Sequence, residues 1–123
     1  MEQNDIEMRE AKSRQLHAQG NNCCQAVVLA YADRLPIGAG EAGQMAAAFG
    51  RGMSGCRQTC GCVSGMAMVC GLCGRSKDFS TLAKLFQEEH GSLNCAELLR
   101  LQGAGHSCND LVASAARLLG EVL

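Results

Sequence analysis

The sequence predicts an all-α protein, a compact multi-helix bundle around a central apolar helix rich in glycine and cysteine at about residues 59–74. Among 123 residues there are only three Phe, one Tyr and no Trp, so Ala, Leu, Val, Met and Cys must form the core. Small side chains with few aromatic or β-branched partners suit closely packed helices better than a sheet. A chain of this length is predicted to form a single domain, residues 1–123, that folds without disulfides.

The N-terminal third predicts two helices separated by a glycine. Residues 1–20 contain a charged amphipathic surface helix, at about 4–19, that stops at Gly20. A second helix covers about 23–34, with apolar residues recurring at helical spacing. It ends before Pro36, the only proline of the chain.

A third helix is predicted at about 41–49, and it leads into a glycine-rich loop over residues 50–56. The loop lacks the G-x-x-x-x-G-K-[ST] pattern of a phosphate-binding loop. Two alternatives remain for it: a backbone that approaches a sulfur atom and donates N–H groups to it, or an ordinary turn.

Residues 59–74 carry no formal charge over sixteen positions. A helix that is apolar on all sides must be buried in protein or in lipid. Because about 20 such residues are needed to span a bilayer, this segment is too short and is predicted to be the central core helix. Gly61, Gly65 and Gly71 each cost about 1 kcal/mol relative to alanine inside a helix. Close packing of the face shared by Gly61 and Gly65 would offset that cost. The alternative is irregular structure in this segment.

The C-terminal half predicts three more helices. One covers about residues 79–89 and ends at His90-Gly91, a short one follows Asn94, and the last runs from Cys108 to the C-terminus.

Charge and composition exclude several classes of function. The net charge is −1, from 11 basic and 12 acidic residues without a basic run, so nucleic-acid binding has no electrostatic support. The polar N-terminus lacks the apolar segment of a signal peptide, and we expect a cytoplasmic protein without membrane insertion. Thiols stay reduced there, and nine cysteines cannot all pair within one chain, so metal binding or thiol redox chemistry remains.

Four of the nine cysteines each follow directly on a helix-capping residue. The pairs are Asn22-Cys23, Thr59-Cys60, Asn94-Cys95 and Ser107-Cys108. Each pair predicts a helix start with cysteine at its first position, and Gln25, Glu97 and Asp110 complete patterns that resemble capping boxes. A thiol at a helix N-terminus has a lowered pKa, which favours the thiolate that binds metals and performs redox chemistry.

We therefore expect Cys23, Cys60, Cys95 and Cys108 to share one site, as metal or cofactor ligands or as redox-active thiols. Two thiolates about 4 Å apart repel by about 4 kcal/mol at an effective dielectric constant of about 20, and a helix end returns only about 0.3–2 kcal/mol. The site must therefore contain a cation, protonated thiols or disulfides. All-thiolate ligation suits an iron–sulfur cluster, zinc or copper(I), and the long spacing matches no local zinc or ferredoxin pattern.

The other five cysteines have secondary roles in this interpretation. Cys56, in the glycine-rich loop, is the best spare ligand. Cys24 and Cys62 are assigned to the core, although Cys62 adjoins the site and is also a possible secondary thiol. Cys70 and Cys73 form a C-x-x-C motif near a helix C-terminus, where the dipole disfavours thiolates. They are predicted to form either a second thiol or metal site or plain core packing.

These motifs resemble a small bacterial and archaeal family of redox-active proteins named for its cysteine pattern, C_GCAxxG_C_C. The resemblance covers about residues 22–119: Asn22-Cys23 with Gln25-Ala26-Val27, Ala48-Phe49-Gly50, residues 59–65, residues 91–95 with Glu97-Leu98-Leu99, and Cys108. The signature cysteines of the family map to Cys23, Cys60, Cys95 and Cys108. The CGAxxG element departs from the family, because Cys62 stands where alanine is usual. Related domains occur beside haem domains in some cytochromes, which implies electron transfer.

The sequence thus favours a redox carrier or metal-binding protein over an enzyme that turns over a substrate. The first hypothesis is an iron–sulfur electron carrier, which would need an electron-transfer protein partner. The alternatives are a metal-free thiol/disulfide redox or sensor protein and a zinc or copper(I) binding or storage protein. An apolar content of 47% in a short bundle is also consistent with a homodimer.

Overall fold

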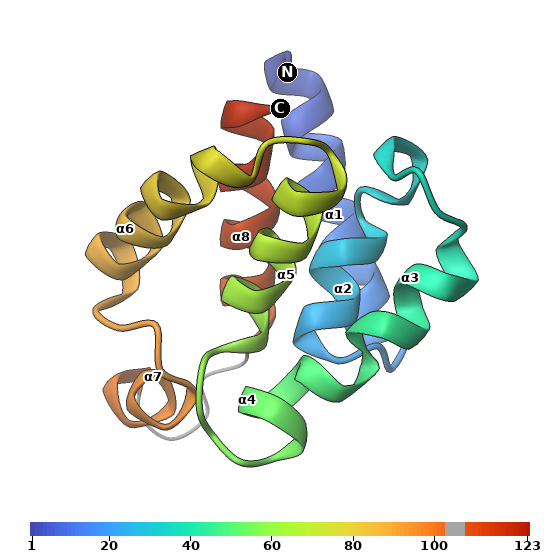
Figure 1. Cartoon of the computed structure of the whole chain (residues 1–123). Coiled ribbons are helices and arrows are strands. Elements are labelled where there is room, and N and C mark those ends of the chain that lie inside the picture. The colour runs from blue at the N-terminus through green and yellow to red at the C-terminus, as the bar shows by residue number, and fades with distance from the viewer. Residues whose placement is uncertain (103–107) are drawn as a thin grey trace.

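The computed structural model describes residues 1–102 and 108–123, and within them the protein is all-helical, as predicted (Figure 1). The helices in chain order are α1 (Gln3–Ala18), α2 (Cys23–Leu29), α3 (Ala39–Ala46), α4 (Gly50–Ser54), α5 (Gly61–Leu72), α6 (Phe79–His90), α7 (Cys95–Gln102) and α8 (Asn109–Val122). Short 3₁₀ segments at Ala32–Arg34, Ala47–Phe49 and Ser76–Asp78 join some of them. Glycines in the left-handed conformation follow α1 and α6, as predicted at Gly20 and Gly91.

Helix α5 is the central helix, as its uncharged sequence predicts. It packs against α2, α6 and α8, and Met66 and Val69 are fully buried (Figure 1). Gly65 allows the close approach of α2, because a Cβ there would lie 3.0 Å from the Cβ of Val27. The segment is a regular helix, so the irregular alternative is wrong.

Helices α1 and α8 run side by side and bring the two termini close together (Figure 1). Ile6 and Ser13 of α1 are buried, whereas Met8 is 68% exposed. Gly120 of α8 permits this packing, because a Cβ there would lie 2.7 Å from Ile6 Cγ1. Helix α1 is therefore one wall of the core as well as a surface helix.

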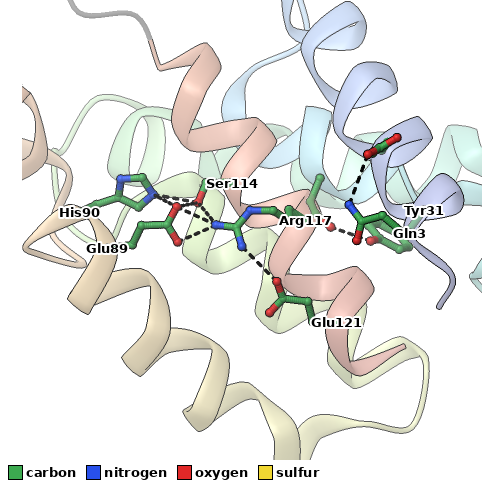
Figure 2. Close-up of polar contacts among 9 residues, drawn as sticks. Gln3, Tyr31, Glu89, His90, Ser114, Arg117 and Glu121 are labelled. Atoms are coloured by element: carbon green, nitrogen blue, oxygen red, sulfur yellow. Dashed lines mark hydrogen bonds and ion pairs between the residues drawn. The ribbon is translucent and has the colours of Figure 1, made fainter.

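Polar contacts fasten α8 to its neighbours (Figure 2). The buried Tyr31 hydroxyl donates a 2.6 Å hydrogen bond to the Ala116 carbonyl. On the other side, Arg117 pairs with Glu89 at 2.6 Å, and Ser114 Oγ lies 2.8 Å from His90 Nε2. These bonds fix α6 and the start of the α2–α3 connection relative to α8.

The predicted loop at 50–56 is a left-handed turn. Arg51, Gly52, Met53 and Ser54 all have positive φ angles, between 52° and 72°. A left-handed conformation costs a residue other than glycine about 1–2 kcal/mol. Local hydrogen bonds within residues 48–58 offset this cost: Ser54 Oγ donates to the Ala48 carbonyl at 2.9 Å, and the Gln58 N–H donates to the Gly52 carbonyl at 3.0 Å.

Two segments far apart in sequence pair just before α5 and α7. Thr59 and Asn94 form an isolated antiparallel bridge. The Cys60 N–H donates to the Leu93 carbonyl at 2.8 Å, and the Cys95 N–H donates to the Gln58 carbonyl at 2.6 Å. This bridge places the starts of α5 and α7 next to each other.

Within the described ranges, no helix has the length and apolar character needed to cross a bilayer.

Candidate functional site

Five cysteines line one cavity of about 430 Å³ at the end of the bundle where α2, α5, α7 and α8 begin. They are Cys23, Cys60, Cys62, Cys95 and Cys108. All four cysteines that follow predicted capping residues are in this group, so folding brings four helix N-termini and their sulfur atoms around a single space.

The local geometry of these helix starts follows the predicted capping in two cases. Asn22 and Gln25 form a capping box around Cys23: the Gln25 N–H donates to Asn22 Oδ1 at 2.9 Å, and the Asn22 N–H donates to Gln25 Oε1 at 3.0 Å. Asn94 caps α7 by accepting the Glu97 N–H at 3.0 Å. Cys23 and Cys95 are therefore first helical residues, as predicted.

The other two starts are displaced by one residue. Thr59 does not cap α5, because it pairs with Asn94, and Cys60 itself occupies the N-cap position. Cys108 likewise occupies the N-cap position of α8. The predicted cap Ser107 lies outside the described residues.

Cys23 has the environment of a thiolate. The Cys62 thiol donates to its sulfur, and the backbone N–H groups of Arg51 and Cys24 add to this effect, which lowers the Cys23 pKa to about 6 against the opposing effect of burial. The Arg51 N–H comes from the left-handed turn. The turn therefore supplies a backbone donor to a sulfur atom, which was one of the two alternatives for this segment.

The thiols of Cys60 and Cys62 also affect each other's pKa. The Cys62 thiol and the N–H groups of Cys62 and Val63 lower the Cys60 pKa. The Cys62 pKa is raised well above its ordinary value, first because the thiol donates to Cys23 and Cys60 and then because it is fully buried. Cys62 is thus the protonated member between two sulfur atoms that favour the thiolate form.

Cys95 and Cys108 complete the lining on the other side. The Arg57 guanidinium donates to Cys95 Sγ at 3.5 Å. Burial, followed by the proximity of Cys23, Cys60 and Cys95, raises the Cys108 pKa.

The remaining lining contains cationic and apolar side chains. Arg51 and Arg57 line the cavity together with His17, and none of the described lining residues is Asp or Glu. Leu98, Leu99 and Leu111 contribute apolar surface. The two guanidinium groups thus offset negative charge that would gather on the sulfur atoms.

Among residues 1–102 and 108–123, no three or more His, Cys, Asp or Glu side chains are grouped so that they could hold one metal ion. The five cysteines of the lining share the cavity described above.

The other four cysteines lie outside the lining. Cys56 is exposed, although the sequence favoured it as a spare ligand. Cys24 is buried against Met68, with 3.9 Å between the two sulfur atoms, and burial raises its pKa to about 12. Burial also raises the Cys70 pKa to about 11, and the Cys73 thiol contacts the Arg34 carbonyl at 3.6 Å.

Sequence reasoning found one further feature of the cavity only in part and missed two others. Cys62 was assigned first to the core and only second as a possible thiol of the site; it is buried and it also lines the cavity. Arg51 and Arg57 have positive φ angles and were not singled out. The only local signal was the glycine density around them, since their proximity to the cysteines depends on contacts between distant segments.

The Cys23 environment gives the first testable prediction. Iodoacetamide should alkylate Cys23 in the reduced, metal-free protein with a rate that rises through a midpoint near pH 6, because only the thiolate reacts. The rate should fall below that pH as the sulfur gains a proton. Mass spectrometry of the modified peptide measures this rate, and unfolded protein should show a midpoint near the ordinary value of about 8.5. A native midpoint at the unfolded value would contradict the described environment.

Comparison with known proteins agrees with the motifs. The family model described as "Putative redox-active protein (C_GCAxxG_C_C)" matches residues 21–122. This match confirms the resemblance found in the motifs. No curated protein and no solved structure matches the chain.

Proposed function

The chain belongs to the C_GCAxxG_C_C family of redox-active proteins, and from that premise we propose that its cysteine cavity holds an iron–sulfur cluster and that the protein carries electrons. Cys23, Cys60, Cys95 and Cys108 would be the ligands. Thiolates are the usual ligands of such clusters.

The observation that carries this proposal is a cavity of about 430 Å³ lined by cysteines from four helix starts. A single tetrahedral zinc ion at about 2.3 Å from each sulfur would require sulfur atoms about 3.8 Å apart around one point. No such group exists among the described residues. A cluster separates its ligands by its own volume, so a lined cavity favours a cluster over a single zinc or copper(I) ion.

The backbone and side chains around the sulfur atoms suit this role. A bound cluster would accept and release single electrons, and hydrogen bonds to its sulfur ligands would tune the potential. The N–H groups of Arg51 and Cys24 face Cys23, those of Cys62 and Val63 face Cys60, and the Arg57 guanidinium donates to Cys95. These donors stabilise negative charge on the ligands without a carboxylate in the lining.

Anaerobic reconstitution with iron and sulfide tests the proposal. The native protein should become brown and retain iron and acid-labile sulfide after desalting. Changing Cys23, Cys60, Cys95 or Cys108 to serine should reduce retained iron by about tenfold or more, the range seen when metal-site groups are lost. The matched control is Cys56→Ser, because Cys56 is exposed and outside the lining, and it should load like the native chain. A colourless native protein, or equal loading of all variants, would reject the cluster.

A further inference from the structure

Cys62 is a buried thiol that is not among the four proposed ligands of the cluster. It is fully buried, yet it lines the cavity beside the predicted ligands. It occupies the second position of α5, directly after Gly61. The cavity thus contains one more cysteine than the proposed cluster requires as ligands.

The sulfur of Cys23 rests on the first turn of α5, beside Cys62. A Cβ at Gly61 would overlap the Cys23 sulfur, so the two helices touch here with only backbone on one side. The Cys62 thiol hydrogen-bonds to this sulfur. The contact is maintained further along the helices, where Gly65 of α5 meets Val27 of α2. Helix packing therefore holds the two thiols together.

The other neighbouring cysteines are poorer partners for Cys62. Cys60 also accepts a hydrogen bond from the Cys62 thiol, but it lies two positions earlier at the start of the same helix, so a disulfide between them would close only a short ring within that segment. Cys24 contacts Met68 and does not line the cavity. Cys23, by contrast, contacts Cys62 from a different helix and lines the same cavity.

We propose that Cys23 and Cys62 form a redox-active dithiol, which a hydroperoxide oxidises to a disulfide in the metal-free protein. The Cys23 thiolate attacks one peroxide oxygen, the O–O bond breaks, and the leaving hydroxide takes up a proton to become water. The Cys62 thiol then attacks the resulting sulfenic acid: the S–S bond forms, the S–O bond breaks, and a second water leaves with the thiol proton. In total two thiols lose two electrons and two protons, and one hydrogen peroxide becomes two waters.

The disulfide can form without a cluster, but its formation would affect cluster binding. The disulfide would consume Cys23, one of the four proposed ligands. Oxidation of the metal-free chain would then block loading until a thiol reductant restores both cysteines. Within the proposed function, the dithiol would regulate assembly of the redox centre.

The test uses reduced, metal-free protein, hydrogen peroxide and peptide mapping. Trypsin should release peptide 15–34 joined to peptide 58–75, and fragmentation should assign the bond to Cys23 and Cys62. In Cys62→Ala, this disulfide should disappear, and dimedone should trap a sulfenic acid on Cys23. The matched control is Cys24→Ala, which removes a buried thiol adjacent to Cys23 but outside the lining. It should form the disulfide at the native rate.

Two results would overturn the proposal. One is a native protein whose Cys23 is oxidised while Cys62 stays a free thiol. The other is a Cys62→Ala protein that joins Cys23 to another cysteine as fast as the native chain forms its disulfide. Mapping of the native chain decides the matter even if the variant does not fold. Since no iron is used, a protein that fails to bind a cluster can still pass or fail this test.

Discussion

Replacing Gly61 with alanine is expected to destabilise the metal-free protein by about 1–3 kcal/mol, the usual cost of overfilling a packed core. The new Cβ would lie 2.4 Å from the Cys23 sulfur, which is a severe clash, and it would also approach the Phe49 carbonyl oxygen to 3.0 Å and the Cys24 backbone nitrogen to 3.2 Å. Because Cys23 would be displaced from the cavity, the variant should also lose most of its capacity to retain iron. Urea unfolding measures the first effect, and reconstitution measures the second.

Gly71→Ala is the matched control on the same helix. A Cβ at Gly71 has no neighbour within 4 Å, and Gly71 has no positive φ angle. Alanine should therefore stabilise α5 by about 0.5–1 kcal/mol through helix propensity. If both alanine variants shifted the urea midpoint in the same direction, the described contact between Gly61 and Cys23 would be incorrect.

The second large effect is expected from Leu98→Ala in α7. Cys95 and Leu98 are the buried residues of this helix among its described side chains, and Leu98 is only 1% exposed. Truncation of a buried leucine costs about 2–5 kcal/mol. Since α7 packs mainly beside α4 and the 57–60 segment, we expect the loss to free α7 locally and to withdraw Cys95 from the cavity.

Amide hydrogen exchange and alkylation of Cys95 measure the effect of Leu98→Ala. Both should accelerate in α7, while α5 and α8 keep most of their protection. Leu101→Ala is the control on the same helix, because Leu101 is 49% exposed, and its effect should stay within about 0.5 kcal/mol. Equal effects of the two substitutions would show that Leu98 does not anchor α7.

The helix starts at Cys23 and Cys95 could be predicted because helix capping is a local property. Asn22 and Gln25 bond to each other within one turn, so their pattern is visible in the sequence. The same holds for Asn94 and Glu97. The uncharged run at 59–74 likewise predicts the central helix, because a wholly apolar helix must be buried.

The errors arise where contacts between distant segments decide the structure. Thr59 could cap a helix by its own chemistry, but it pairs with Asn94, so the cap moves to Cys60. Cys62 was correctly predicted to be buried, but its contact with Cys23 depends on how closely α2 packs on α5. None of these contacts follows from local sequence.

Iron K-edge X-ray absorption of the protein loaded anaerobically tests the central proposal most directly. The account predicts iron surrounded by about four sulfur atoms, together with a second iron atom at short distance, as in a cluster held by four cysteines. Iron bound to nitrogen or oxygen donors, or isolated ions without an iron neighbour, would contradict it.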